Sequence, residues 1–161
     1  LMIVYSDNTA TNVLMDKLGI DQINEEIKKL GYRDSKLCRK MMDFKAAEEG
    51  RQNYTSVKEM FDLMDRLYSS TLLGSPYDEQ MLEIMKGQAD ETMMRQELPD
   101  EITIARKSGE LDALDHDIAI VYTEKGDYIY IFFVWDARDN NQARDILSKT
   151  SRMVFDDFID K

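Results

Sequence analysis

Residues 117–135 read DIAIVYTEKGDYIYIFFVW, and this stretch decides the fold class. It contains two runs rich in apolar residues, 117–123 and 128–135, separated by the polar turn EKGD at 124–127. Two such runs around a glycine-containing turn predict an antiparallel β-hairpin. Every position from 128 to 135 is apolar or aromatic. This pattern predicts a central strand that is covered on both faces.

The segments around the hairpin extend this prediction. Residues 102–110, ITIARKSGE, predict another strand that ends at a glycine. From Arg138 onward, apolar residues at helical spacing predict a terminal amphipathic helix. The same spacing predicts earlier helices over 9–18, over 21–30, over 57–68, from Pro76, and over 91–98. We therefore expect an α+β fold in one domain, with a helical part at 1–100 and a strand-rich part at 101–161.

Two local patterns refine the helical part. Val13, Leu14 and Leu18 share one face of the first helix, which we expect to point inward. Ser56 and Glu59 have the spacing of a capping box at a helix start. Residues 32–54 show no period and are long for a connection, which is typical of a functional loop.

Composition excludes several classes of function. The chain has 161 residues and a formal net charge of -11, with no basic block, which argues against nucleic-acid binding. A single cysteine, Cys38, excludes an internal disulfide, and with a single histidine, His116, a zinc site is not expected. We expect neither a metal nor another cofactor.

Two short motifs carry chemical side chains. Ser6-Asp7-Asn8 precedes the first predicted helix, and Lys107-Ser108-Gly109 lies in the strand before the hairpin. Taken alone, the first motif has the composition of a helix cap. The second, taken alone, fits a solvated strand edge.

Together, in this order and context, the motifs resemble the penicillin-recognising serine hydrolases, and most closely the class A β-lactamase family. Three longer stretches extend the resemblance over nearly the whole chain, at 6–19, 53–68 and 106–134. The resemblance implies the β-lactamase/transpeptidase-like fold. It also implies acyl transfer from a β-lactam or a peptidoglycan-like small molecule, without nucleic acid as a partner.

The resemblance implies catalytic roles for three residues. The hydroxyl of Ser6 would relay a proton toward the leaving nitrogen. Lys107 would lie close to Ser6 and bring positive charge into the cleft. The backbone N–H of Glu110 would form one half of the oxyanion hole, whereas its side chain should not matter.

Substrate binding is implied for three further residues. Asn8 would hydrogen-bond the amide side chain of the substrate, and Ser108 would hydrogen-bond its carboxylate. Gly109 would leave room for substrate beside the strand, since it has no side chain. We expect Asp7 to hold the turn.

The sequence departs from the family in its nucleophile. No serine has a lysine three positions further on; only Thr55 and Lys58 have this spacing, and we interpret them as part of a helix start. We expect the chain alone to be inactive and to be the C-terminal part of a longer protein. The helix with the nucleophile and the first two strands would then precede residue 1.

The second departure lies in the long loop. Class A enzymes carry Arg-x-Glu-x-x-Leu-Asn there, and the glutamate activates the deacylating water. Here Arg39 matches the arginine, but Met41 falls where the glutamate is expected. Asp43 is the nearest acid and the candidate for the deacylation role. Slow deacylation or a cell-wall peptide substrate is therefore an open alternative to fast β-lactam hydrolysis.

Two other interpretations remain at this stage. The chain could be a catalytically inactive β-lactamase-like module that binds a ligand or a partner protein, or an unrelated α+β domain with chance motifs. In the family, the strand at 128–135 pairs with a strand that this chain lacks, so we expect a second chain or swapped segment on that edge. The resemblance implies a secreted or extracytoplasmic location.

Overall fold

The computed structural model describes residues 1–161. Helices precede a sheet and one long helix follows it, which confirms the predicted α+β class. The elements are α1 (Asn8–Leu18), α2 (Ile20–Lys29), α3 (Phe44–Glu48), α4 (Val57–Tyr68), α5 (Tyr77–Lys86), the 3₁₀ turn η1 (Met93–Arg95), β1 (Thr103–Leu111), β2 (Leu114–Thr123), β3 (Gly126–Trp135) and α6 (Asn140–Asp160).

The three strands form one antiparallel sheet in the order β1-β2-β3. The predicted hairpin is confirmed, because β2 and β3 pair from Thr123↔Gly126 to Leu114↔Trp135. Among the strands of these 161 residues β2 is central and β3 lies at an edge, so residues 128–135 do not form a central strand within this chain as predicted. The apolar run has another cause: helices cover both faces of the sheet, so β3 is half-buried on either side.

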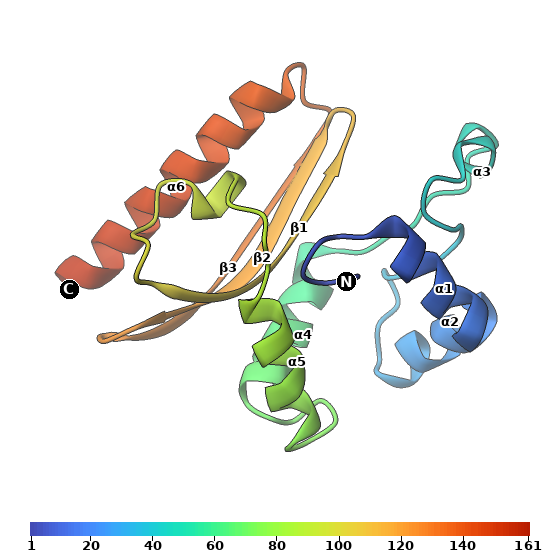
Figure 1. Ribbon diagram of the computed structural model, residues 1–161, viewed down its shortest axis with the longest axis horizontal. Coiled ribbons are helices and arrows are strands. Elements are labelled where there is room, and N and C mark those ends of the chain that lie inside the picture. Colours follow the sequence, from blue (N-terminus) through green and yellow to red (C-terminus); the bar gives the residue numbers. More distant parts are fainter.

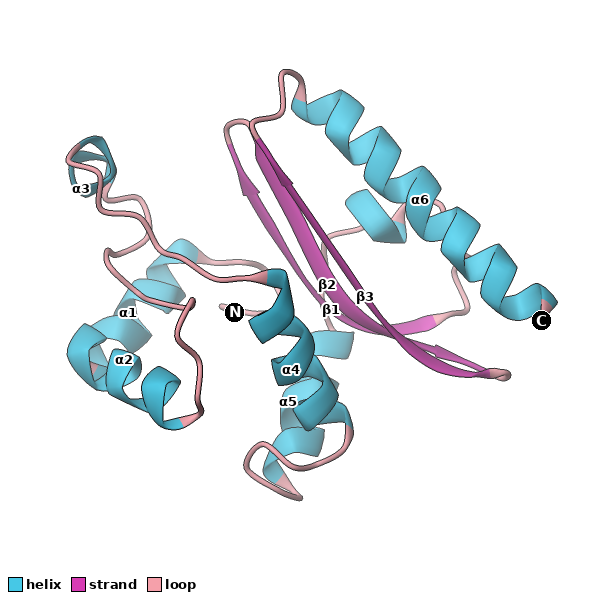
Figure 2. Ribbon diagram, turned by 180° about the vertical axis from the view of Figure 1, so that it is seen from behind, coloured by secondary structure: helices cyan, strands magenta, loops and turns pink.

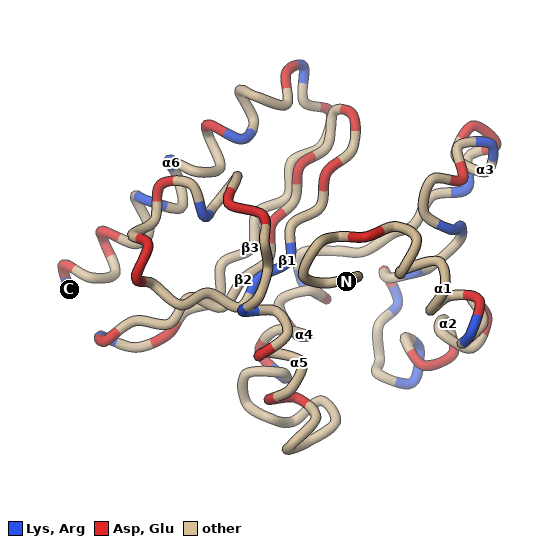
Figure 3. Tube along the Cα trace, in the orientation of Figure 1, with Lys and Arg blue, Asp and Glu red and all other residues tan.

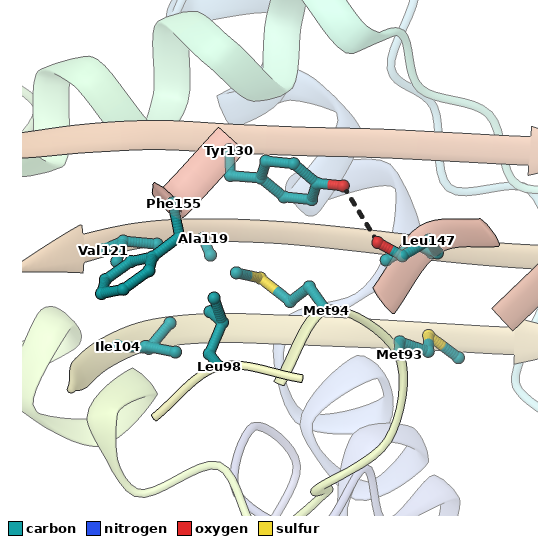
Figure 4. Close-up of a cluster of buried hydrophobic side chains, with 9 residues drawn as sticks. All are labelled: Met93, Met94, Leu98, Ile104, Ala119, Val121, Tyr130, Leu147 and Phe155. Carbon is teal, nitrogen blue, oxygen red and sulfur yellow. Dashed lines mark hydrogen bonds between the residues drawn. The ribbon is translucent and has the colours of Figure 1, made fainter. Parts of the chain in front are cut away.

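Figures 1 and 2 show α6 along one face of the sheet, with α4 and α5 against the other. On the α6 side, the core joins η1, the strands and α6. There the hydroxyl of Tyr130 donates to the carbonyl of Leu147 over 3.3 Å (Figure 4). The members of this core are Met93, Met94, Leu98, Ile104, Ala119, Val121, Tyr130, Leu147 and Phe155.

The second core lies on the opposite face. Met64 and Leu67 of α4 pack with Leu82 and Met85 of α5 against Ala105 and Ile120 of the sheet. This packing fixes α5 against β1, and α4 against β2 and β3. Helices α4 and α5 of the helical part are thereby packed against the sheet of the strand-rich part.

Several local predictions need correction. Val13, Leu14 and Leu18 of α1 are exposed, and Met15 is the buried residue of that helix. The predicted helix over 91–98 is only the short turn η1. In the predicted capping box, Ser56 accepts from the amide of Glu59, but the carboxylate of Glu59 binds other amides.

Figure 3 shows acidic residues along the whole chain with basic residues between them, and no block of one sign. None of the helices combines the length and the apolar character that crossing a membrane requires.

Candidate functional site

The two sequence motifs meet in space. The ammonium of Lys107 donates to the hydroxyl of Ser6 with Nζ and Oγ 2.5 Å apart. Lys107 lies on β1, an edge strand of the sheet, and Ser6 lies just before α1. The pairing of a serine hydroxyl with a lysine therefore depends on the fold, which brings the start of α1 to the free edge of β1.

The turn before α1 presents Ser6. Its backbone has φ of 50°, in the left-handed region that side chains other than glycine seldom adopt. Asp7 follows as the N-cap, and its carboxylate accepts from the amide of Ala10 at 2.5 Å. The hydroxyl of Thr11 donates to the carbonyl of Asp7 at 2.8 Å. Asp7 thus holds the turn, and Ser6 stays exposed beside the helix start.

Lys107 is half-buried in the same region. Besides Ser6, its ammonium donates to the carbonyl of Ser108. Burial lowers the pKa of Lys107, and the positive charge of Arg106 adds to this, while Asp117 and Asp90 oppose it. The ammonium of Lys107 therefore loses its proton at a lower pH than that of a solvated lysine.

A cavity of about 860 Å³ opens at this meeting point. Its wall includes six of the seven residues for which the resemblance implied or suggested a substrate or catalytic role, namely Ser6, Asn8, Lys107, Ser108, Gly109 and Glu110, but not Asp43. A Cβ added at Gly109 would meet no atom within 4 Å, so β1 borders open space there. The far wall is the long loop, which contributes Arg39, Met41 and Met42.

Glu110 and Ser108 have further partners. The carboxylate of Glu110 pairs with Arg144 of α6 at 2.6 Å, so this side chain has a structural contact. Ser108 is 7% exposed and lines the cavity together with Asp90. Burial works to raise the pKa of Asp90, but hydrogen bonds from Ser108 and Thr92 bring it below its ordinary value.

A buried ion pair lies behind β1, and sequence reasoning missed it. Arg106, 2% exposed, donates from Nε and Nη2 to the carboxylate of Asp117 at 3.2 and 2.8 Å. Burial raises the pKa of Asp117 to about 6, although Arg106 opposes this rise. The only signal was a pair of charged residues inside two apolar strands. His116 and Asp117 both lie within β2.

Three polar side chains hold the long loop in place, and the sequence did not reveal them. Asn12 of α1 bonds both the amide and the carbonyl of Met41, at 2.8 and 3.0 Å. Asn53 accepts from the amides of Cys38 and Arg39. Glu59 of α4 accepts from three consecutive amides at 33–35.

Asp43, the candidate for the deacylation role, lies on the long loop but outside the cavity wall. The carboxylate of Asp43 caps α3 by accepting from the amide of Ala46 at 3.0 Å. Asp43 is also absent from the wall of the cavity, where Met41 and Met42 lie. This geometry gives Asp43 a capping role, and its predicted part in deacylation receives no support.

Comparisons with known proteins agree with this geometry. The sequence model described as the "beta-lactamase enzyme family" matches residues 1–158. A curated "Beta-lactamase" from Proteus vulgaris is 26% identical over 163 residues, which cover 96% of this chain and 59% of that protein. The chain therefore spans less than two thirds of the length of this relative.

Solved structures show the same relation. A β-lactamase from Sphaerobacter thermophilus DSM 20745 superposes with a TM-score of 0.87 and 26% identity, over 98% of this chain and 60% of that one. The protein PBP-A superposes with a TM-score of 0.86 and 26% sequence identity, over 100% of this chain and 60% of that one. A point mutant of PBP-A, also 26% identical, was solved as an acyl-enzyme complex with penicillin G, with the same TM-score and coverage.

Proposed function

The chain belongs to the beta-lactamase enzyme family, and from that premise we propose that its cavity is the acyl-transfer cleft of a serine hydrolase. The resemblance read from the sequence is thereby confirmed at the level of the family and the fold. The proposed reaction opens a β-lactam or a cell-wall peptide amide. The observation that carries the proposal is the contact between Ser6 and Lys107 in the wall of the cavity.

The nucleophile must come from outside these 161 residues, because no serine of the chain has a lysine three positions further on. When that serine attacks the carbonyl, the leaving nitrogen needs a proton. Ser6 supplies it through its hydroxyl, which Lys107 contacts directly. A positioned hydroxyl next to a cation is suited to this relay because the ammonium stabilises the negative charge that develops on the hydroxyl oxygen as its proton leaves. Ser6 then takes up the proton that the attacking serine released, so the relay carries one proton from the nucleophile to the leaving nitrogen.

Substrate binding follows from the same wall. Lys107 supplies positive charge for a substrate carboxylate, and Ser108 lines the same wall of the cavity. Asn8 offers an amide to the side chain of the substrate, and Gly109 leaves the face of β1 open. The N–H of Glu110 serves as one donor to the developing oxyanion.

We propose that the acyl-enzyme is long-lived. Deacylation requires a base that activates water near the ester. The loop wall of the cavity contributes Arg39 and the methionines Met41 and Met42, and Asp43 is engaged in capping α3. This arrangement favours a penicillin-binding activity, or turnover of a cell-wall peptide, over fast β-lactam hydrolysis.

Other features of the proposal concern the whole protein. The chain forms one domain, and the free edge of β3 at 128–135 pairs with a further strand, either from the same protein or from a second chain. The family relation favours a secreted or extracytoplasmic location. No metal or other cofactor enters the proposed chemistry.

Labelling with a fluorescent penicillin tests the proposal. The full-length protein, with its Ser-x-x-Lys segment, should give a covalent fluorescent band. Replacement of the motif serine should abolish the band, and Ser6→Ala should slow its appearance. An unlabelled protein at saturating probe would contradict the proposal and would favour a catalytically inactive module that binds a ligand or a partner.

A further inference from the structure

Arg106 precedes Lys107 on β1, so the two side chains point to opposite faces of the sheet. Lys107 faces the cavity, whereas Arg106 is among the fully buried side chains. Asp117 lies diagonally opposite on β2, two positions from Ala119, the register partner of Arg106. The guanidinium and the carboxylate of this pair form two parallel hydrogen bonds.

The remaining donors of Arg106 reach the segment 88–92, which connects α5 to η1. Its Nη1 donates to the carbonyl of Asp90, and its Nη2 donates to that of Thr92 at 3.3 Å. The same Nη2 lies 3.6 Å from the carboxylate of Asp90. One buried side chain therefore fastens this connecting segment to both β1 and β2.

The connecting segment is also part of the cleft. Gln88, Ala89 and Asp90 line the cavity, and the amide of Ala89 donates to the carbonyl of Val4 at 2.9 Å. Val4 precedes Ser6 by two residues. Contacts therefore run from Arg106 through Asp90, Ala89 and Val4 toward Ser6, which meets Lys107, the chain neighbour of Arg106. The path closes into a ring.

We propose that Arg106 and Asp90 are positioning residues of the acyl-transfer cleft. Arg106 sets the separation of Ser6 and Lys107 by fixing the connecting segment against β1, and the carboxylate of Asp90 holds the turn of that segment by accepting from the amide and the hydroxyl of Thr92. This inference rests on the function proposed above. It adds two residues to the cleft, Arg106 and Asp90, that belong to neither of the two short motifs.

The ring also controls the charge of Lys107. The charged groups that act on its ammonium are Arg106 on β1, Asp117 on β2 and Asp90 on the connecting segment. The two carboxylates favour the protonated ammonium and Arg106 disfavours it. Removal of the charge on Asp90 therefore makes the ammonium lose its proton at a lower pH.

The test uses the full-length protein and measures penicillin acylation against concentration and pH. Arg106→Lys keeps the positive charge but loses the fork of donors. We expect its acylation rate at saturating penicillin to fall at least about tenfold, since misplaced groups lose more than this. Asp90→Asn keeps the shape of the side chain, and we expect the alkaline limb of its pH profile to move down by about 0.5 unit or more.

Matched controls are Arg95→Lys, because Arg95 binds the carbonyls of Leu98, Pro99 and Asp100 outside the ring, and Asp100→Asn on the surface. If Arg106→Lys does not fold, the pH profile of Asp90→Asn decides. Folded variants with the wild-type rate and pH profile would overturn the positioning role while the proposed function stands. A wild-type protein that is not acylated would overturn both.

Discussion

The ammonium nitrogen of Lys107 lies 2.5 Å from the hydroxyl oxygen of Ser6, although 101 positions separate these residues in the chain. The contact joins the start of α1 to β1 across the cavity. Ser6 is exposed, whereas Lys107 is half-buried. Held together, they form a donor pair suited to proton transfer and to binding an anion.

Ser6→Ala tests the proton relay in the full-length protein. We expect the rate of penicillin acylation to fall about 100-fold or more, because a positioned proton donor contributes this much. Thermal stability should stay close to wild type, since Ser6 is exposed. The control is Thr9→Ala, in the first turn of α1 and outside the cavity wall. Equal rates for both variants would refute the relay.

Lys107 predicts a pH dependence. Burial lowers the pKa of its ammonium from the usual 10.5. As pH rises through this lowered pKa, the cleft loses its positive charge, and affinity for a carboxylate-bearing penicillin should fall. Binding measured from pH 7 to 10.5 should show this alkaline limb, and Lys107→Ala should remove it. Affinity that stays constant across this range would contradict the role of Lys107.

Gly109→Ala should separate folding from activity. A Cβ at this position would meet no atom within 4 Å, and the backbone needs no positive φ. We therefore expect stability to change by less than about 1 kcal/mol, while a methyl group in the cleft slows acylation about tenfold. Gly126→Ala is the opposite control, because φ of 123° strains any side chain there. It should reduce stability and leave the acylation rate unchanged.

Asn12→Ala should release the long loop from α1. Both backbone groups of Met41 lose their partner in this variant. We expect a loss of about 1–3 kcal/mol in the free energy of unfolding, since unpaired polar groups cost this much. Protease cleavage between residues 39 and 52 should become faster. The exposed Asn141→Ala is the control, and an Asn12→Ala loop as resistant as wild type would contradict the anchoring.

Tyr128 predicts a change at alkaline pH. Its hydroxyl is buried without a hydrogen-bond partner, and burial raises its pKa to about 12. The folded pKa exceeds the unfolded value of about 10. Below pH 10 this group is protonated in both states and does not make stability depend on pH; as pH rises from 10 toward 12, the unfolded state ionises first and stability falls. Tyr128→Phe should remove this dependence and should raise stability at pH 7 by up to about 1 kcal/mol.

Tyr130→Phe is the matched comparison for this prediction. Its hydroxyl donates to the carbonyl of Leu147, so the variant should lose about 1 kcal/mol at pH 7. Urea unfolding at pH 7 and pH 11 measures both variants. A destabilised Tyr128→Phe protein at pH 7 would show that its hydroxyl has a partner.

The sequence revealed those features that depend on local patterns. Two apolar runs around EKGD indicated the hairpin, and the cap chemistry of Asp7 indicated the start of α1. The motif residues were found because their spacing and order resemble a known family. Their contact in space agrees with that resemblance.

Features that depend on tertiary contacts escaped the sequence. The apolar run 128–135 could not distinguish an edge strand from a central one, since helices cover both faces of β3. Glu59 has the spacing of a capping box, yet distant amides at 33–35 bind its carboxylate. Arg106 and Asp117 pair only once β1 and β2 align. No local pattern encodes such partners.

Intact-mass spectrometry of the full-length protein with penicillin G tests the central claim most directly. The account predicts an adduct that is heavier by one whole penicillin molecule, forms in the wild type, persists over minutes and forms far more slowly in Ser6→Ala. No adduct at saturating penicillin, or one that forms equally fast in Ser6→Ala, would contradict the account.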